Sequence, residues 1–225
     1  MEMKSKFVSI ASHEFRTPLS TISLASGFVK KFKNKMTGED LDKKLVTIET
    51  QVKHMSSLLD DILTIGKADA GKIEVNWVSL PVRTFFENLA LEVVESARRS
   101  HRINMKIDYS AENFRTDEGL IRNVVINLLN NAIKFSQKSD EVDFEITGND
   151  SRLIISVRDH GIGIPTEDVE KLFQPFYRGG NVATISGTGL GLSIVKKAID
   201  LLGGDITMKS ELGKGAEFTI TLPSP

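Results

Sequence analysis

VSIASHEFRTP, residues 8–18, is the stretch that decides how the first part of this chain folds. From here on, apolar residues recur in alternating steps of three and four. These residues are Val8, Ala11, Phe15, Pro18, Ile22, Ala25, Val29 and Phe32. Such heptad spacing predicts a helix that packs against partner helices along one seam. His13 lies off the seam, so its ring is expected to point outward, beside Glu14.

The proline of this stretch is expected to bend the helix. Pro18 has no N–H for the carbonyl of Glu14, and its ring crowds that carbonyl, so the bend should lie just beyond His13. An outward imidazole beside a carboxylate on a locally bent helix is a candidate reactive group. A lone surface histidine is usually inert, so this interpretation depends on what the rest of the chain carries.

A second long helix is predicted to follow the first, which should run from about Lys4 to about Asn34. Residues 37–40, TGED, have the composition of a turn and a helix N-cap. The second seam is predicted at Leu45, Ile48, Val52, Met55, Leu59 and Ile62. The resulting antiparallel hairpin has an apolar stripe widened by Phe7, Leu19, Leu24, Leu58 and Leu63. A homodimeric four-helix bundle would bury this stripe; the alternative is a cover supplied by the C-terminal part of the chain.

Composition excludes several classes of function. The chain has 225 residues, 40% of them hydrophobic and 26% charged, which is typical of globular proteins. The net charge of −1 gives no support for a nucleic-acid partner, and the lack of cysteine excludes disulfides, thiolate metal sites and cysteine catalysis. The sequence has neither a run of about 18 apolar residues nor a signal peptide. We therefore expect a soluble, cytoplasmic protein, or the cytoplasmic part of a longer membrane receptor whose membrane segments are absent from this chain.

Residues 72–225 are predicted to form a second domain, after an all-α domain of residues 1–71. A short strand at 72–78 should open it. Further helices are expected at 81–100, 117–135 and 189–202, and further strands at 103–109, 142–147, 153–158, 205–211 and 216–222. Apolar residues alternate with others along several of these strands, which is typical of a sheet with one covered face. Helices gathered on one face of a mixed sheet make an α+β sandwich.

Three clusters in the second domain carry candidate chemistry. In the first, Asn127 and Asn131 lie one helical turn apart, and Lys134 lies nearly on the same side. Amide oxygens suit Mg²⁺ and an ammonium group suits phosphate oxygens, so the three side chains suit a metal–triphosphate. For this cluster alone, a solvated polar face would be the simpler interpretation.

The other two clusters are rich in glycine. Asp159 follows a predicted strand and can accept a hydrogen bond from an exocyclic amine such as that of adenine, while Gly161 and Gly163 let the backbone pass close to a ring. Residues 187–191, GTGLG, open a helix, where free N–H groups favour phosphate. Alone, the first of these could be an ordinary turn, and the second is a weak pattern. Between them, residues 173–186 are predicted to form a mobile lid.

Together these motifs resemble those of the sensor histidine kinases of two-component systems. HEFRTP at residues 13–18 is similar to the phosphoacceptor box of that family. The asparagine box, two glycine boxes, a phenylalanine box at 172–176 and GKGAEF at 213–218 appear in the family's order. The resemblance covers nearly the whole chain. It implies a helical hairpin that forms a dimeric four-helix bundle, followed by the sandwich shared with gyrase and heat-shock chaperone ATPases.

The resemblance also implies a role for each matching residue. Asn127 and Asn131 would hold Mg²⁺, Lys134 would contact phosphate, and Asp159 would bind the adenine amino group of ATP. The other nucleotide-binding residues implied are Phe135, Gly161, Gly163, Ile164, Phe173, Arg178, Gly187, Thr188, Gly189, Leu190 and Gly191. Two positions depart from the family pattern without threatening ATP binding: Asn123 stands where many members have Gln, and Phe135 replaces a frequent Tyr.

By the same resemblance, His13 would accept the γ-phosphoryl group of ATP and pass it to an aspartate of a response regulator. Glu14 would fix the tautomer of His13, and Thr17, one turn on, could position water that dephosphorylates the regulator. The handedness of the turn at 34–40 decides whether His13 reacts with the ATP of its own chain or of its partner, and both stay open. Two other functions are considered: an ATP-driven clamp, which leaves His13 and Glu14 without a role, and a scaffold that binds ATP without catalysis.

Overall fold

The computed structural model describes residues 2–97, 100–136, 139–182, 185 and 187–225, and for residues 2–8 it describes the backbone only. The chain divides into two compact units, Met1–Gly66 and Lys67–Pro225. Within the described ranges, no helix combines the length and the apolar character that crossing a membrane requires.

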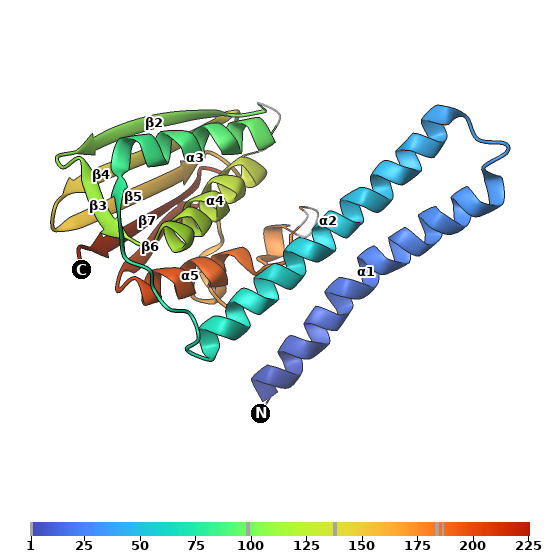
Figure 1. Cartoon of the computed structure of the whole chain (residues 1–225), viewed down its shortest axis with the longest axis horizontal. Helices are drawn as coiled ribbons and strands as arrows, with labels where there is room; N and C mark the ends of the chain where they lie inside the picture. The colour runs from blue at the N-terminus through green and yellow to red at the C-terminus, as the bar shows by residue number, and fades with distance from the viewer. Residues whose placement is uncertain (1, 98–99, 137–138, 183–184, 186) are drawn as a thin grey trace. The chain divides into compact units, whose positions relative to one another are not determined.

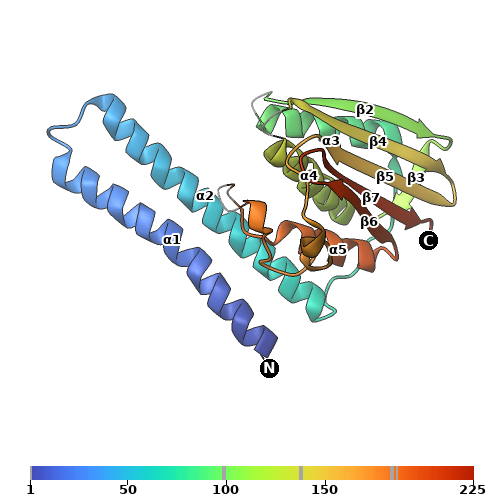
Figure 2. The same ribbon diagram turned by 180° about the vertical axis from the view of Figure 1, so that it is seen from behind.

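The first unit is a helical hairpin (Figures 1 and 2). α1 (Glu2–Phe32) and α2 (Gly38–Asp69) run side by side in opposite directions, which confirms the predicted hairpin. α1 continues through Pro18, which is buried. Thr37 and Asp40 cap α2 reciprocally, because Asp40 N donates to Thr37 Oγ1 at 3.1 Å and Thr37 N donates to the Asp40 carboxylate at 3.4 Å.

The structure corrects the seam predicted for α2. The buried and half-buried positions that recur in steps of three and four are Leu41, Lys44, Ile48, Gln51, Met55, Leu58, Ile62 and Ile65. Leu45, Val52 and Leu59, which were placed on the seam, are instead 44%, 49% and 49% exposed. Leu58, expected only to widen the stripe, is fully buried. The prediction is right for Ile48, Met55 and Ile62. It fails at the other three positions because polar Lys44 and Gln51 occupy inward positions and hide the true period.

Asp61, on α2, is expected to make the stability of the hairpin depend on pH. Burial, and then the charge of Asp60, raise the pKa of Asp61 from 3.8 to about 6. The protonated carboxyl therefore stabilises the fold fully below pH 3.8, and this contribution is lost as the pH rises to about 6. After allowance for solvent screening, Asp61→Asn should raise the free energy of unfolding at pH 7 by about 1 kcal/mol. Urea unfolding at about pH 4 and pH 7 measures this, and an identical pH dependence in both proteins would contradict it.

The described residues of the second unit form two sheets and three α-helices. In chain order its elements are β1 (Val78–Pro81), α3 (Val82–Ser96), β2 (Arg102–Tyr109), β3 (Asn113–Thr116), α4 (Glu118–Phe135), β4 (Glu141–Asn149), β5 (Arg152–Asp159), the 3₁₀ turns η1 (Thr166–Lys171) and η2 (Gly180–Val182), α5 (Gly191–Leu201), β6 (Asp205–Glu211) and β7 (Gly215–Pro223). The larger sheet has the order β2-β4-β5-β7-β6, in which β2 pairs parallel with β4 and the following pairs are antiparallel. α3, α4 and α5 lie on one face of it (Figures 1 and 2), which confirms the α+β sandwich.

One predicted strand is wrong, and two short strands were not predicted. No strand forms at 72–77; the first strand is β1, which pairs antiparallel with β3. Both strands have four residues, too few for an alternating pattern to stand out in the sequence. Asp117 links this region to the start of α4, because its carboxylate accepts hydrogen bonds from Leu120 N at 2.9 Å and from Asn76 N at 2.7 Å.

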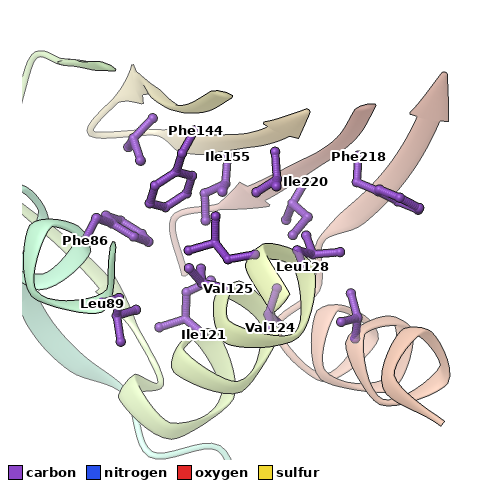
Figure 3. Packing of buried hydrophobic residues seen from close by; sticks show 14 of the residues in the cluster. Phe86, Leu89, Ile121, Val124, Val125, Leu128, Phe144, Ile155, Phe218 and Ile220 are labelled. Carbon is purple, nitrogen blue, oxygen red and sulfur yellow. The ribbon is translucent and has the colours of Figure 1, made fainter. Parts of the chain in front are cut away.

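The core of this unit lies between the helices and the larger sheet (Figure 3). The alternating residues predicted for β4 and β5 are at most 1% exposed, and Phe144 on β4 meets Phe86 of α3 edge to face at 6.0 Å between ring centroids. Ile121, Val124, Val125 and Leu128 of α4 fill the space opposite Ile155 and Ile220. This packing fixes the C-terminal half of α4 relative to the end of β5. The candidate site lies there.

Candidate active site

The first part of the site is the polar face of α4. Asn127 Nδ2 donates to the carbonyl of Asn123 at 2.8 Å, one turn back, so that Asn127 Oδ1 points away from its own helix. A Cβ on Gly191, at the start of α5, would lie 2.7 Å from that oxygen and 3.9 Å from Asn131 Nδ2. Glycine at position 191 therefore lets the N-terminus of α5 approach both asparagines.

Lys134 adds a positive charge next to the polar face of α4. A Cβ on Gly187 would overlap the Lys134 ammonium group. The glycine cluster at residues 187–191 therefore contacts the asparagine and lysine cluster of α4. Burial, and then the charge of Arg178, lower the pKa of Lys134. Among the ion pairs of the described residues, none includes Lys134. Two neighbouring cations beside a helix N-terminus favour a bound anion.

The second part of the site is the loop that follows β5. Asp159 is 6% exposed, and its Oδ1 accepts a hydrogen bond from Gly161 N at 2.9 Å. Burial raises the pKa of Asp159, against the opposing effects of the Gly161 and Ala216 N–H groups and of His160. Gly161 passes so close to the end of α4 that a Cβ would overlap the carbonyl oxygen of Phe135. The loop that holds this buried carboxylate thus contacts the end of the helix that carries the asparagine face.

Two further residues of this loop are fixed by the neighbouring strand. A Cβ on Gly163, whose φ is 66°, would overlap the carbonyl oxygen of Glu211 at the end of β6. Ile164 N donates to Ser210 Oγ at 2.9 Å. Close approach of the loop to β6 therefore requires glycine at position 163.

The long segment between the glycine clusters is anchored at both ends. Phe173 packs against the hydrophobic core, and Phe176 N donates to the carbonyl of Gly189 at 2.9 Å. Leu190 is fully buried, and its N–H donates to Thr188 Oγ1 at 3.3 Å. Residues 183–184 and 186 of the predicted lid lie outside the described residues, so its mobility stays a prediction.

His13 lies on the hairpin, in the other unit. Its side chain is 73% exposed, and Nδ1 lies 3.7 Å from Glu14 Oε1. Thr17 is exposed one turn further on, and its carbonyl accepts a hydrogen bond from Thr21 Oγ1 at 3.1 Å. His13 is therefore accessible, as the sequence predicts, with a carboxylate beside one ring nitrogen.

Sequence reasoning missed several residues that support this site. Ser136 is fully buried at the end of α4. The Ser136 Oγ accepts a hydrogen bond from His160 N at 3.2 Å. The His160 ring nitrogen Nε2 lies 2.9 Å from Asp143 Oδ2 on β4. These residues tie the loop after β5 to α4 and β4. The only signal in the sequence was their position next to the asparagine cluster and Asp159.

Comparison with known proteins assigns the family. Residues 116–225 match the family described as histidine kinase-, DNA gyrase B-, and HSP90-like ATPase, and residues 3–71 match the His Kinase A (phospho-acceptor) domain. Sensor protein SrrB of Staphylococcus aureus (strain MRSA252) is 31% identical over 229 residues, which cover 100% of this chain and 39% of SrrB. The chain thus spans well under half of that relative. It belongs to the sensor histidine kinases of two-component systems.

Solved structures agree with this assignment. The Acinetobacter baumannii histidine kinase AdeS has a TM-score of 0.74 and 25% sequence identity, over 94% of this chain and 98% of AdeS. Full-length ShkA in complex with AMPPNP has a TM-score of 0.70 and 27% identity, over 98% of this chain and 46% of ShkA. ThkA in complex with the response regulator TrrA, at 23% identity and a TM-score of 0.73, supports the fold.

Proposed function

We propose that this chain phosphorylates itself on His13 at the expense of ATP, with residues 1–71 as the phosphoacceptor part and residues 72–225 as the nucleotide-binding part. The observation that supports this most is the convergence of three chemically distinct groups in one unit. They are the amide oxygen of Asn127, the Lys134 ammonium beside Gly187, and the buried carboxylate of Asp159. An adenine nucleotide needs an acceptor for its amine and cations for its phosphates, and the glycines leave room for it.

Asn127 and Asn131 fit Mg²⁺ as ligands. They offer neutral amide oxygens, the donor type that this ion accepts, and Gly191 leaves space beside Asn127 Oδ1. When bound, Mg²⁺ would neutralise part of the charge on the phosphates. Lys134 and Arg178 bring positive charge of their own to the same place, and Asp159 would orient the base by accepting its amino proton.

His13 supplies the nucleophile. Glu14 Oε1 is close to Nδ1, so a small side-chain rotation lets Nδ1–H donate to it and fixes the tautomer with a free lone pair on Nε2. Nε2 then attacks the γ-phosphorus, a nitrogen–phosphorus bond forms, and the bond to the bridging oxygen breaks to release ADP. The 73% exposure of the side chain leaves Nε2 accessible for this reaction.

The test is incubation with γ-labelled ATP and Mg²⁺, followed by treatment of the labelled protein with acid and base. We expect a label that is lost in acid and kept in base, the behaviour of a phosphoramidate. It should be absent from His13→Ala and unchanged in His54→Ala, which removes another exposed histidine of the hairpin. ATP turnover without label would instead support the ATP-driven clamp, and binding without turnover would support the scaffold.

We propose further that the hairpin dimerises through its exposed apolar row. Leu45, Val52 and Leu59 recur every seven residues on α2 and are each at least 44% exposed. In a dimeric four-helix bundle such a row beside the inner seam is buried. Leu59→Glu would bury a charge there and should raise the dimer dissociation constant at least about a hundredfold, measured by sedimentation. Ser56→Glu, at an exposed polar position, is the control; unchanged dimerisation of Leu59→Glu would exclude this face.

A response regulator is the proposed acceptor of the phosphoryl group, in the cytoplasm, where ATP is available. Thr17 is exposed on the turn after His13, so its hydroxyl can position water near an aspartyl phosphate docked on this face. Thr17→Ala is expected to slow the decay of the phosphorylated regulator about tenfold or more, with little effect on labelling of His13. Phospho-regulator decay measured with Ser20→Ala, exposed nearby, gives the control, and an unchanged rate for Thr17→Ala would refute the role.

A further inference from the structure

Asp168 is a buried carboxylate that the reaction above does not use. It lies in η1, and only 6% of it is exposed. Its Oδ1 accepts a hydrogen bond from the hydroxyl of Tyr177 at 2.5 Å, and its Oδ2 accepts one from Gly180 N at 3.2 Å. A Cβ on Gly179 would lie 2.8 Å from the same Oδ2. One carboxylate therefore holds residues on both sides of Arg178.

Arg178 itself is held by neutral groups. Its Nη2 donates to the carbonyl oxygens of Val182, at 3.0 Å, and Ile185. A Cβ on Gly189 would lie 2.8 Å from the carbonyl oxygen of Tyr177, so the residue before Arg178 packs against the glycine cluster of the proposed phosphate site. Asn181 Nδ2 adds another tether by donating to the carbonyl of Gly163 at 2.9 Å. The backbone around Arg178 is thus fixed, while the partners of its side chain among the described residues are neutral carbonyl groups.

A bound phosphate would offer Arg178 stronger partners. Hydrogen bonds from a guanidinium to charged oxygens are shorter and stronger than those to carbonyls. With its backbone anchored, Arg178 can exchange partners by rotating its side chain. Without the anchor, the loop around it must also be ordered when the ligand binds, which weakens binding.

We propose that Asp168 and Tyr177 form a latch that positions Arg178 against the terminal phosphate of ATP, and that this latch gives the site its preference for a nucleoside triphosphate over the diphosphate. The inference rests on the proposed function, because it takes Asp159 and Lys134 to bind the same nucleotide. Asp168 and Tyr177 are positioning residues in this scheme. Neither contacts the phosphates.

The test compares two dissociation constants, those of ADP and of the non-hydrolysable analogue AMP-PNP, in the presence of Mg²⁺. Tyr177→Phe removes only the hydroxyl that Asp168 holds. We expect it to weaken AMP-PNP binding about tenfold and to leave ADP binding within about twofold. Asp168→Asn should act in the same direction. Tyr109→Phe, which loses a hydroxyl that donates to the carbonyl of Asn149 at 2.9 Å, is the matched control and should change neither constant.

Arg178→Ala completes the experiment. If the latch acts through Arg178, this variant loses the same preference, and adding Tyr177→Phe to it causes no further loss. The proposal is overturned if Tyr177→Phe keeps the wild-type ratio of the two constants, or if the two changes add. If Asp168→Asn does not fold, Tyr177→Phe decides alone. Binding needs no phosphoryl transfer, so a wild-type protein that is never labelled on His13 would refute the proposed function while this ratio still tests the latch.

Discussion

Replacing Asp159 with Asn is expected to weaken ATP binding about a hundredfold. The buried carboxylate of Asp159 accepts a hydrogen bond from Gly161 N. In the proposed site, the same carboxylate also accepts a hydrogen bond from the adenine amino group. In the variant, the amide oxygen must still accept from Gly161, so the amide N–H₂ turns toward the base. Two buried donors then face each other, and each unsatisfied donor costs about 1–3 kcal/mol. About 2.8 kcal/mol in total corresponds to the hundredfold loss.

Inosine triphosphate separates lost recognition from lost folding. It carries a carbonyl oxygen where adenine carries its amino group, so it suits an amide donor and not a carboxylate. We expect the wild-type protein to prefer ATP and Asp159→Asn to bind inosine triphosphate at least equally well, as measured by calorimetric titration. Asp108→Asn, an exposed change on β2, should bind as the wild type does. A variant at position 159 that still preferred ATP would contradict the assignment of Asp159 to the adenine amine.

The sequence predicted the fold where one regular period dominates. From Ala11 to Phe32, the predicted seam residues of α1 are buried or half-buried, and the alternating residues of β4 and β5 lie in the core. On α2 the period was hidden, because Lys44 and Gln51 lie at inward positions that apolar patterns miss. β1 and β3 were not predicted, because their pairing joins residues far apart in the chain and local sequence patterns do not encode such pairing.

The residues of the candidate site likewise fall into those that a local sequence pattern predicts and those that it does not. Its predicted residues come from short local motifs, and the structure brings Asn127, Gly191, Lys134 and Gly187 together from two helices and a loop. Asp168 shares no local pattern with its partners, since Tyr177 lies nine positions further along the chain. Its significance depends on burial and on which atoms surround it. Only the folded chain supplies that information.

Gly161→Ala is expected to lower nucleotide affinity at least about a hundredfold while leaving the core of the second unit folded. A Cβ at this position would overlap the carbonyl oxygen of Phe135 and lie 3.0 Å from Asp159 Oδ1. The Phe135 carbonyl belongs to the end of α4, which cannot retreat without moving the asparagine face. The loop must move instead, and with it the Gly161 N–H that holds Asp159 and the Ile162 N–H that donates to Phe135 O at 3.3 Å. Both parts of the nucleotide site are then displaced from each other.

Gly119→Ala is the matched control at the other end of α4. Its nearest neighbour is Asp117 Oδ1 at 3.4 Å, an ordinary contact, and alanine stabilises a helix relative to glycine by about 1 kcal/mol. This variant should bind ATP as the wild type does and melt slightly higher, whereas Gly161→Ala should keep its far-ultraviolet circular dichroism and lose ATP binding. The two substitutions add the same methyl group, so the difference between them isolates the close approach of the loop to α4. If Gly161→Ala bound ATP within about threefold of the wild type, that approach would not be what assembles the adenine pocket.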